Sequence, residues 1–515
     1  MDKSHLTRYM PSPMTQADQQ HTHTSQTDAS YERLSAMDSS FLHFERANTP
    51  MHVGGTVIFD AGPLVTPEGG VDIKRIHAHI ASRLHIVPRY RQRLAYVPIE
   101  STPVWVDDAN FNLRYHIRHT SLPRPGTEQQ LKRLCGQLMS QPLDRRKPLW
   151  ELWIVEGLKG GRFALVGKTH HCMVDGISGV DLLTALLRST PDETIEDPPA
   201  WTPRRAPSTW QLVRDAVARR ASTSVKFLQN LEDALQAPED VSARLVENLG
   251  AVLETIDAGL QPAADTPLNR PLGPHRRFDW LAIDLAELKA VKNQLGGTVN
   301  DVVLATVAGA VRHFLRHRRI KPDALPYRVA IPVSTRLPEE YGSMGNRVSA
   351  WLIDLPIEER DPRRRLARVR ATTAALKQSK QARGFETLIR LAEWTGSIPL
   401  AAGARLASWM QPFNLIVTNV PGPQVPLYLL GAEAIRGYPL VPLFEYQCLG
   451  VAVLSYMGKV CWGVNADWDR VPDLRVFVAA IRRSFEELRE AAKLPTIGRK
   501  RVAVEQPMRA AGGQR

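Results

Sequence analysis

The chain contains 515 residues, carries a formal net charge of +13 at pH 7 and is 43% hydrophobic. This length suits two or three domains or one two-lobed enzyme with a large core, and the composition is typical of a globular protein. The positive charge favours an anionic partner or surface. Because the basic residues are neither interleaved with aromatics nor placed in a recognisable module, nucleic acid is not the expected partner.

The cysteines and the N-terminal region indicate the compartment. The four cysteines have neither metal-ligand spacing nor the density of a disulfide framework, which is typical of a reducing environment. Residues 1–30 lack the apolar core of a signal peptide and are predicted to be a disordered tail. No stretch approaches the roughly 20 apolar residues that a membrane span requires. We therefore expect a cytoplasmic protein that is not secreted and that meets membranes only at their surface.

A first lobe is predicted over residues 31–189, where the hydrophobic pattern alternates between strand-like and helix-like periods. The expected strands are 52–60, 151–156 and 163–170, and the expected helices are 73–84, 128–137 and 177–188.

Residues 190–274 are predicted to form a Pro/Arg-rich, partly helical linker, because prolines cannot continue a helix or donate to a sheet. Within it, Trp210, Val213 and Val217 lie on one face of a predicted helix over residues 208–236. Such a helix fits either a membrane interface or packing between two lobes, and the sequence leaves both open.

A second lobe is predicted over residues 275–498, followed by a basic flexible tail at 499–515. Its expected strands are 278–285, 327–333, 348–355, 414–418, 448–456 and 459–465, and its expected helices are 298–317, 363–377 and 472–492. Thr298, with Asp301 three residues later, predicts a capping arrangement at the start of a helix. Thr418 and Asn419 precede a Pro-Gly-Pro segment, which predicts a rigid turn at the end of a strand.

The strongest chemical signal is His170-His171-Cys172-Met173-Val174-Asp175-Gly176, which follows a predicted strand and precedes a predicted helix. Adjacent side chains on a strand point to opposite faces, so one histidine is expected to act on substrate while its neighbour is structural. An imidazole exchanges protons readily near neutral pH, and Gly176 permits a turn that brings Asp175 back to a ring. The structural alternative is a packed core histidine tied to Asp175.

Two other chemistries fit this heptapeptide less well. A thiolate nucleophile at Cys172 is disfavoured because its side chain is expected to turn away from that of His171. A zinc site built from His170, His171 and Asp175 is disfavoured by the opposed directions of the imidazoles. No metal is therefore expected.

The heptapeptide resembles the H-H-x-x-x-D-G signature of the CoA-dependent acyltransferases that share the chloramphenicol acetyltransferase-like fold. Further stretches are similar to motifs of the bacterial wax ester synthase/diacylglycerol acyltransferase family. They are Leu34-Ser35-Ala36-Met37-Asp38, Met51-His52-Val53-Gly54, Pro148-Leu149-Trp150-Glu151, Thr298-Val299-Asn300-Asp301-Val302-Val303, Gly345-Asn346 with Leu355-Pro356, and Thr418-Asn419-Val420-Pro421-Gly422-Pro423. The resemblance runs from about residue 34 to residue 494, in the family's order.

This resemblance implies an α/β (α+β) fold of two chloramphenicol acetyltransferase-like lobes, each a mixed β-sheet flanked by helices, joined by the partly helical linker. It implies an O-acyltransferase that moves a fatty acyl group from acyl-CoA, a substrate rather than a cofactor, to diacylglycerol or a long-chain fatty alcohol. His171 is the implied general base, and Asp175 and His170 are the other implied catalytic residues. The lipid acceptor implies peripheral contact with the inner face of the plasma membrane or with lipid bodies.

Further residues are expected to support the site. The resemblance assigns importance to Asn300 and Asp301, which are expected to hold the second lobe against the histidine. Thr418 is expected to donate to a developing oxyanion, by analogy with the hydroxyl of related sites. The remaining supporting residues are Gly176, Pro148, Leu149, Trp150 and Asn419.

Two alternative functions stay open on the sequence. A related acyltransferase would take its acyl group from a carrier protein or act on a polyketide or peptide alcohol, because those enzymes share the H-H-x-x-x-D-G signature. A protein of another class would be a non-catalytic lipid-surface protein that keeps an inherited core.

Overall fold

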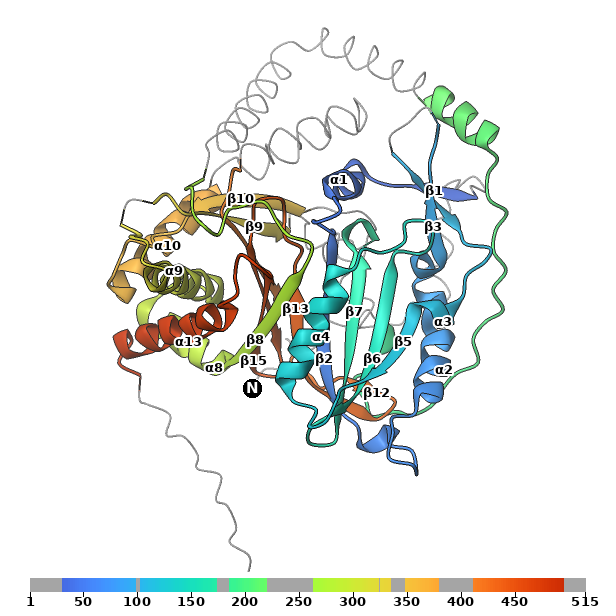
Figure 1. The fold of residues 1–515 in the computed structure, drawn as a ribbon, viewed down its shortest axis with the longest axis horizontal. Coiled ribbons are helices and arrows are strands. Elements are labelled where there is room, and N and C mark those ends of the chain that lie inside the picture. The colour runs from blue at the N-terminus through green and yellow to red at the C-terminus, as the bar shows by residue number, and fades with distance from the viewer. Residues whose placement is uncertain are drawn as a thin grey trace, which may run out of the picture.

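The computed structural model describes residues 30–98, 102–173, 185–219, 263–323, 325–334, 348–378 and 411–494. Within these residues the strands form two six-stranded sheets and a three-stranded sheet, and Figure 1 shows the two large sheets side by side with helices packed on them. The first half contains β1 (Tyr31–Arg33), α1 (Ala36–Phe44), β2 (His52–Asp60), α2 (Ile73–Arg83), β3 (Gln92–Ala95), β4 (Val104–Asp107), α3 (Leu113–His116), β5 (Ile117–Ser121), α4 (Glu128–Ser140), β6 (Trp150–Leu158) and β7 (Arg162–His170). The second half contains β8 (Arg276–Asp284), α8 (Leu285–Leu295), α9 (Val299–His317), β9 (Arg328–Ser334), β10 (Val348–Asp354), α10 (Pro362–Gln378), β11 (Leu415–Pro421), β12 (Tyr428–Leu429), β13 (Ala432–Leu440), β14 (Leu449–Tyr456), β15 (Lys459–Asp467) and α13 (Leu474–Ala491).

The first large sheet has the strand order β12-β13-β2-β7-β6-β5. Its central strand β7 is mostly apolar because both of its faces are covered: Phe163 and Leu165 pack with residues of α2, whereas Ala164 and Val166 pack with residues of α4. Strands β12 and β13 come from the second half of the chain, in a segment for which the hydrophobic pattern predicted no strand. The first sheet is therefore completed by a distant part of the chain.

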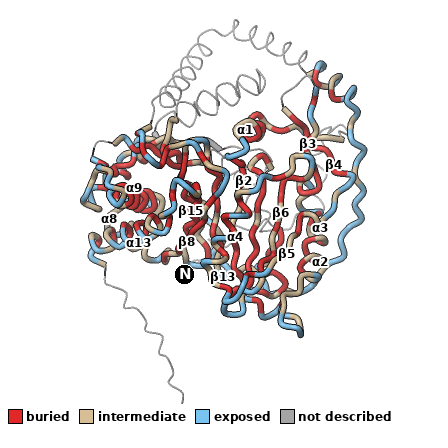
Figure 2. Tube along the Cα trace, viewed as in Figure 1, coloured by how far each residue is buried: buried red, intermediate tan, exposed pale blue. Residues whose placement is uncertain are grey.

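The second large sheet has the strand order β10-β9-β11-β14-β15-β8, with both parallel and antiparallel pairs. Helix α9 is buried along most of its length, because it contacts α8, α10 and α13 within the helical layer (Figure 2). Thr298 and Asp301 form a capping box at its start, as predicted: each backbone N–H donates to the other side chain. The expected fold of two lobes, each a mixed sheet with helices, is confirmed.

Every strand and helix predicted within the described residues is present, with ends that differ by a few residues. The predicted helix 177–188 lies almost entirely outside the described residues. The same holds for the predicted tails, of which only residue 30 is described. The strands and α-helices that the pattern did not predict are β1, β3, β4, β5, β12, β13, α1, α3 and α8.

The linker helix is described only over residues 209–219, and there the face that carries Trp210, Val213 and Val217 is not the buried one. Leu212 and Ala216 are buried against the three-stranded sheet, where they pack with Val104. In contrast, Trp210 is 75% exposed and Val217 is 55% exposed. The three-stranded sheet, which the hydrophobic pattern did not predict, covers the face of the helix that carries Leu212 and Ala216. That face adjoins the one that carries Trp210 and Val217.

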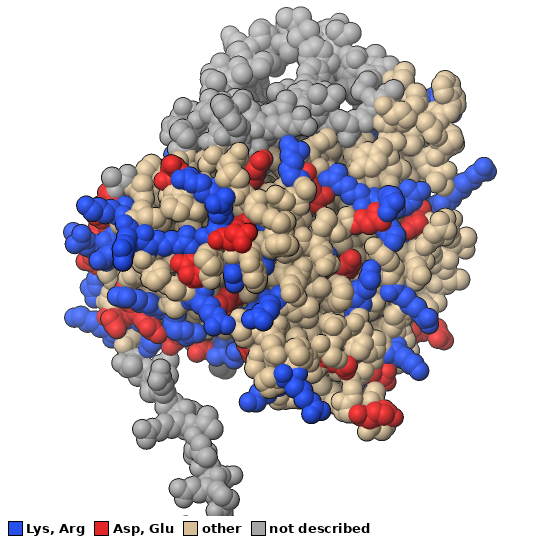
Figure 3. Space-filling view, in the orientation of Figure 1, with Lys and Arg blue, Asp and Glu red and all other residues tan. Residues whose placement is uncertain are grey.

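Basic side chains gather over the helical layer of the second half, interspersed with carboxylates (Figure 3). On α10, Arg363 and Arg364 are exposed, but Arg365 is fully buried and donates from Nη2 to Glu487 Oε2 at 3.3 Å. Among the residues that the structure describes, no helix combines the length and the apolar character needed to cross a membrane.

Helix α4 joins the two halves by packing against β8. A Cβ atom at Gly136 would lie 2.6 Å from the backbone oxygen of Arg276, so only glycine fits this approach without a shift. The N–H of Arg276 donates to Ser140 Oγ at 2.8 Å, and Lys132 forms an ion pair with Asp279. The relative position of the two sheets therefore depends on a small residue at position 136.

We expect Gly136→Ala to destabilise the protein although alanine favours a helix. The gain in helix propensity is about 0.5–1 kcal/mol, whereas overpacking against a backbone atom costs about 1–3 kcal/mol, so mid-range values give a net loss of about 1 kcal/mol. Urea unfolding would measure it. Gln137→Ala, at the next and exposed position of α4, is the control and should change the free energy of unfolding by less than about 0.5 kcal/mol. Equal stability of the two variants would contradict the prediction.

Candidate active site

The histidine pair lies where β7 ends. His170 is the last residue of β7, and His171 begins a short 3-10 turn, η5 (His171–Met173). The N–H of His170 donates to the backbone oxygen of Leu149 at 2.9 Å, and the N–H of His171 donates to that of Met51 at 2.8 Å. The chain segments that lead into β6 and β2 thus hold the main chain of the pair from both sides. Asp175 and Gly176, expected to complete the motif, lie outside the described residues.

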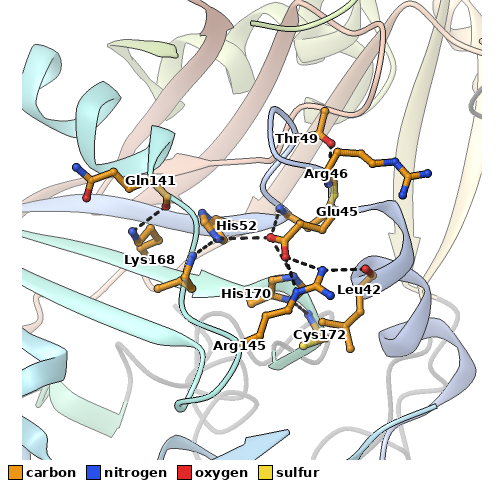
Figure 4. Close-up of polar contacts among 12 residues, drawn as sticks. Leu42, Glu45, Arg46, Thr49, His52, Gln141, Arg145, Lys168, His170 and Cys172 are labelled. Atoms are coloured by element: carbon orange, nitrogen blue, oxygen red, sulfur yellow. Dashed lines mark hydrogen bonds and ion pairs between the residues drawn. The ribbon is translucent and has the colours of Figure 1, made fainter. Parts of the chain in front are cut away.

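His170 is completely buried, and a polar group lies close to each of its ring nitrogens (Figure 4). Its Nδ1 accepts the backbone N–H of Cys172 at 3.1 Å, and its Nε2 lies 3.5 Å from Glu45 Oε1. A ring nitrogen that accepts a hydrogen bond carries no proton, so the ring proton is on Nε2, facing the carboxylate. His170 therefore has the geometry of the structural member of the pair.

His171 is only partly buried and stacks on Phe41 of α1, with ring centroids 3.6 Å apart and an interplanar angle of 13°. Within the described part of the chain, its Nδ1 has no hydrogen-bond partner. Burial of the ring, with a smaller contribution from the nearby His170, lowers the pKa of His171 to about 4. The imidazole is thus neutral at pH 7, which is the form that accepts a proton.

Glu45 is a contact residue of the pair that motif reasoning missed. It follows the last residue of α1 and lies between two of the recognised motifs, 34–38 and 51–54. Its Oε2 accepts from Arg145 Nε at 2.8 Å, while His52 Nε2 lies 3.8 Å from Oε1. Burial alone would raise the pKa of this carboxyl, but the contacts with His170 and Arg145 outweigh it and lower the pKa to about 2. The only feature of the sequence that could have indicated a role for Glu45 is its position between the motifs at 34–38 and 51–54.

Pro148, Leu149 and Trp150 are buried at the start of β6. Leu149 receives the hydrogen bond of His170, and Trp150 Nε1 donates to the backbone oxygen of Tyr90 at 2.8 Å. The segment contacts the histidine pair through the backbone oxygen of Leu149, and the side chain of Trp150 is packed in the core. This placement is that of a scaffold.

The supporting residues of the second half meet one another. Asn419 Nδ2 donates to Asn300 Oδ1 at 3.2 Å, and Asp301 Oδ1 accepts from Thr373 Oγ1 of α10 at 2.7 Å. In the part of the chain that the structure describes, neither asparagine is hydrogen-bonded to the histidine pair. These residues join β11, α9 and α10, so their geometry is that of a brace within the second half.

Aromatic contacts connect His171 to the second half. Phe41, which stacks on His171, contacts Phe44 at a centroid distance of 6.5 Å, and Phe44 contacts Phe444 at 5.6 Å. Phe444 packs with residues on one face of β11, and strand alternation places Thr418 on that same face. Asn419 consequently points to the opposite face, toward α9.

Neither a thiolate nor a metal is supported by the described geometry. Cys172 lies in η5 and not on a strand, so the expectation that strand alternation separates its side chain from that of His171 is wrong; the residue is 3% exposed. Burial, followed by the charge of Asp38, raises the pKa of this thiol well above its usual range, so it has no nucleophilic character at pH 7. Among the described residues, no three His, Cys, Asp or Glu side chains are arranged to hold a metal ion.

The arrangement of the two sheets defines the class of protein. The structure matches that of a trichothecene 15-O-acetyltransferase from Fusarium sporotrichioides with a TM-score of 0.58, covering 90% of this chain and 97% of that one. At 11% sequence identity this likeness concerns the fold alone. The fold is that of the chloramphenicol acetyltransferase-like acyltransferases.

Sequence comparison narrows the class to one family. Residues 34–303 match the wax ester synthase/diacylglycerol acyltransferase catalytic domain, and residues 344–489 match the WS/DGAT C-terminal domain. A Mycobacterium tuberculosis protein named as a diacylglycerol O-acyltransferase is 33% identical over 476 residues, which cover 92% of this chain and 98% of that one. The solved wax ester synthase/diacylglycerol acyltransferase from Marinobacter aquaeolei is 28% identical, with a TM-score of 0.62 and coverage of 90% and 100%.

The chain therefore belongs to the wax ester synthase/diacylglycerol acyltransferase family and is an acyltransferase that acts on lipid alcohols. The predicted family, fold class and activity are confirmed. The roles of individual residues stay predictions.

The low pKa of His171 predicts an unusual pH dependence. A general base must be neutral to accept a proton. The pKa of His171 lies below the ordinary value of 6.5, so its neutral form persists as the pH falls to about 4. We expect kcat/KM to stay level between about pH 5 and pH 7 and to fall about tenfold per unit below about pH 4. Return of aliquots to pH 7 would separate reversible protonation from denaturation. A half-maximal value near pH 6.5 would contradict the assignment.

Proposed function

We propose that this enzyme transfers a fatty acyl group directly from acyl-CoA to a lipid alcohol, with His171 as the general base. The imidazole takes the proton of the hydroxyl while the oxygen attacks the thioester carbonyl. Collapse of the tetrahedral oxyanion breaks the carbon–sulfur bond, and the imidazolium returns the proton to the CoA thiolate. The observation that carries the proposal is the contrast within the pair. His170 is fully buried, with Nδ1 hydrogen-bonded to the Cys172 N–H and Nε2 facing Glu45, whereas His171 is neutral and partly exposed.

Two further residues have proposed roles in the same reaction. Asp175 would orient the ring of His171 or hold the turn after it, as family resemblance implies. Thr418 would donate its hydroxyl to the oxyanion, a contribution of about 10²-fold to 10³-fold where it exists. Its position on the face of β11 that meets Phe444 supports an orientation toward the junction of the two halves.

The acceptor is proposed to be diacylglycerol, a long-chain fatty alcohol or both. The name of the Mycobacterium tuberculosis relative supports the first, and that of the Marinobacter enzyme supports both. Membership of this family also supports acyl-CoA as the acyl donor, which the reaction consumes as a substrate.

We also propose peripheral contact with an anionic lipid surface, such as the inner face of the plasma membrane or a lipid body. Trp210 and Val217 project from the helix at 209–219, and Tyr96 at the adjoining sheet is 54% exposed. A hydrogen bond from Tyr31 Oη to Asp215 Oδ2 at 3.0 Å anchors this helix on the sheet. An exposed tryptophan on an anchored helix, in a protein of charge +13, suits insertion among lipid headgroups.

His171→Ala should lower kcat by about 10²-fold to 10⁴-fold without unfolding the protein, because it removes the proposed base. The assay is CoA release from palmitoyl-CoA with hexadecanol or diolein offered separately, with the products resolved by chromatography. Cys172→Ala, at the adjacent position of η5, is the control and should retain activity. A folded and fully active His171→Ala variant would refute the mechanism, and acceptor-independent CoA release by the native enzyme would refute the transfer.

Trp210→Glu should reduce co-sedimentation with anionic liposomes several-fold, since a charged side chain disfavours insertion at the interface. Val65→Glu is the matched control, because Val65 is 50% exposed and follows the end of β2 remote from the histidine pair. Both variants change the net charge equally. Equal loss of sedimentation in the two variants would show that charge alone governs binding, and unchanged sedimentation of Trp210→Glu would exclude this surface.

A further inference from the structure

We infer that Glu45 is a positioning residue that holds both histidines through a single carboxylate. Its Oε1 lies 3.5 Å from His170 Nε2 and accepts the backbone N–H of Met51 at 3.2 Å. Its Oε2 accepts from Arg145 Nε at 2.8 Å. The inference rests on the proposed role of His171 as the base.

The first connection runs through the ring of His170. Because Nδ1 of this ring accepts the N–H of Cys172, the proton on Nε2 faces Glu45. A ring held between an acceptor at one nitrogen and a donor at the other has a fixed plane and tautomer. The Cys172 N–H that it fixes belongs to η5, the turn that begins with His171.

The second connection runs through the main chain of Met51, which is fully buried. Its N–H donates to Glu45 Oε1, and its carbonyl oxygen accepts the N–H of His171 at 2.8 Å. Independently of the carboxylate, the main-chain N–H of Glu45 donates to the backbone oxygen of Phe41, the residue that stacks on His171. The position of the base is therefore set on two sides by groups that Glu45 holds.

Arg145 keeps this carboxylate in place. Its guanidinium pairs with Glu45 and donates from Nη2 to the backbone oxygen of Leu42 in α1 at 2.9 Å (Figure 4). The pKa of about 2 keeps Glu45 ionised across the working range of pH. A nearly buried carboxylate without this partner would bear an uncompensated charge, so the pair forms a rigid unit beside the site.

Glu45→Gln tests the inference, because glutamine keeps the shape but loses the charge that holds Arg145 and the ring of His170. We expect kcat to fall about 10-fold to 100-fold with the KM for acyl-CoA little changed, as for a displaced catalytic group. The decisive measurement is a double-mutant cycle with His171→Ala. If Glu45 acts through the base, Glu45→Gln lowers the residual rate of the His171→Ala protein by less than twofold, roughly the error of such a cycle.

Glu151→Gln is the matched control. Glu151 also forms a buried ion pair, with Lys168 Nζ at 3.1 Å, and Lys168 lies two residues before His170 in β7. This variant should lower the thermal stability by a similar amount while kcat stays within about twofold, because the contacts of Glu151 within the described residues, with Lys168 and Trp153, do not include either histidine of the pair. Should Glu45→Gln fail to fold, Glu45→Asp enters the same cycle, since it keeps the charge but withdraws the carboxylate by one methylene.

The positioning role is overturned if Glu45→Gln leaves kcat unchanged, or if it lowers the rate equally with and without His171. It is also overturned if Glu151→Gln reduces kcat as strongly, since general loss of packing would then explain both. A fully active His171→Ala variant would instead refute the proposed base, which is a separate result.

Discussion

An ionised carboxylate with little solvent access is stable only where donors surround it, and in this protein that requirement fixes the geometry of the site. The donors around Glu45 come from Arg145, from the main chain at Met51 and from the ring of His170. These donors lie in the loop before β6, in the chain before β2 and at the end of β7, and Glu45 itself follows the last residue of α1. Because these segments converge on one group, none can shift alone without leaving a polar group unpaired.

The two histidines have different surroundings although they are adjacent in sequence. The ring of His170 is enclosed and lies between the N–H of Cys172 and the carboxylate of Glu45. The ring of His171 stacks on Phe41 and remains partly accessible, and burial keeps it neutral. Sequence adjacency thus produces two different environments, because the strand ends at the first histidine and a tight turn begins at the second.

The two halves are coupled by backbone as well as by side chains. Strand β13 leaves the second half and pairs with β2, the strand whose start lies beside His170. Helix α4 approaches β8 at Gly136, and the aromatic contact between Phe44 and Phe444 closes the junction near α1. A site beside such a junction is assembled only when both halves are folded, which suits an enzyme that must bring together two separate lipid substrates.

The sequence by itself determined the family, the alternating strand and helix pattern and the position of the histidine pair, because these are local signals of periodicity and of residue identity at fixed spacing. It also predicted the capping box of Thr298 and Asp301, which spans only three residues. Only the tertiary structure decided the pairing of Glu45 with His170, the contact of Asn300 with Asn419, the passage of β13 into the first sheet and the buried face of the linker helix. Each of these joins segments remote in sequence, and such contacts depend on how the sheets and helices pack rather than on any local preference.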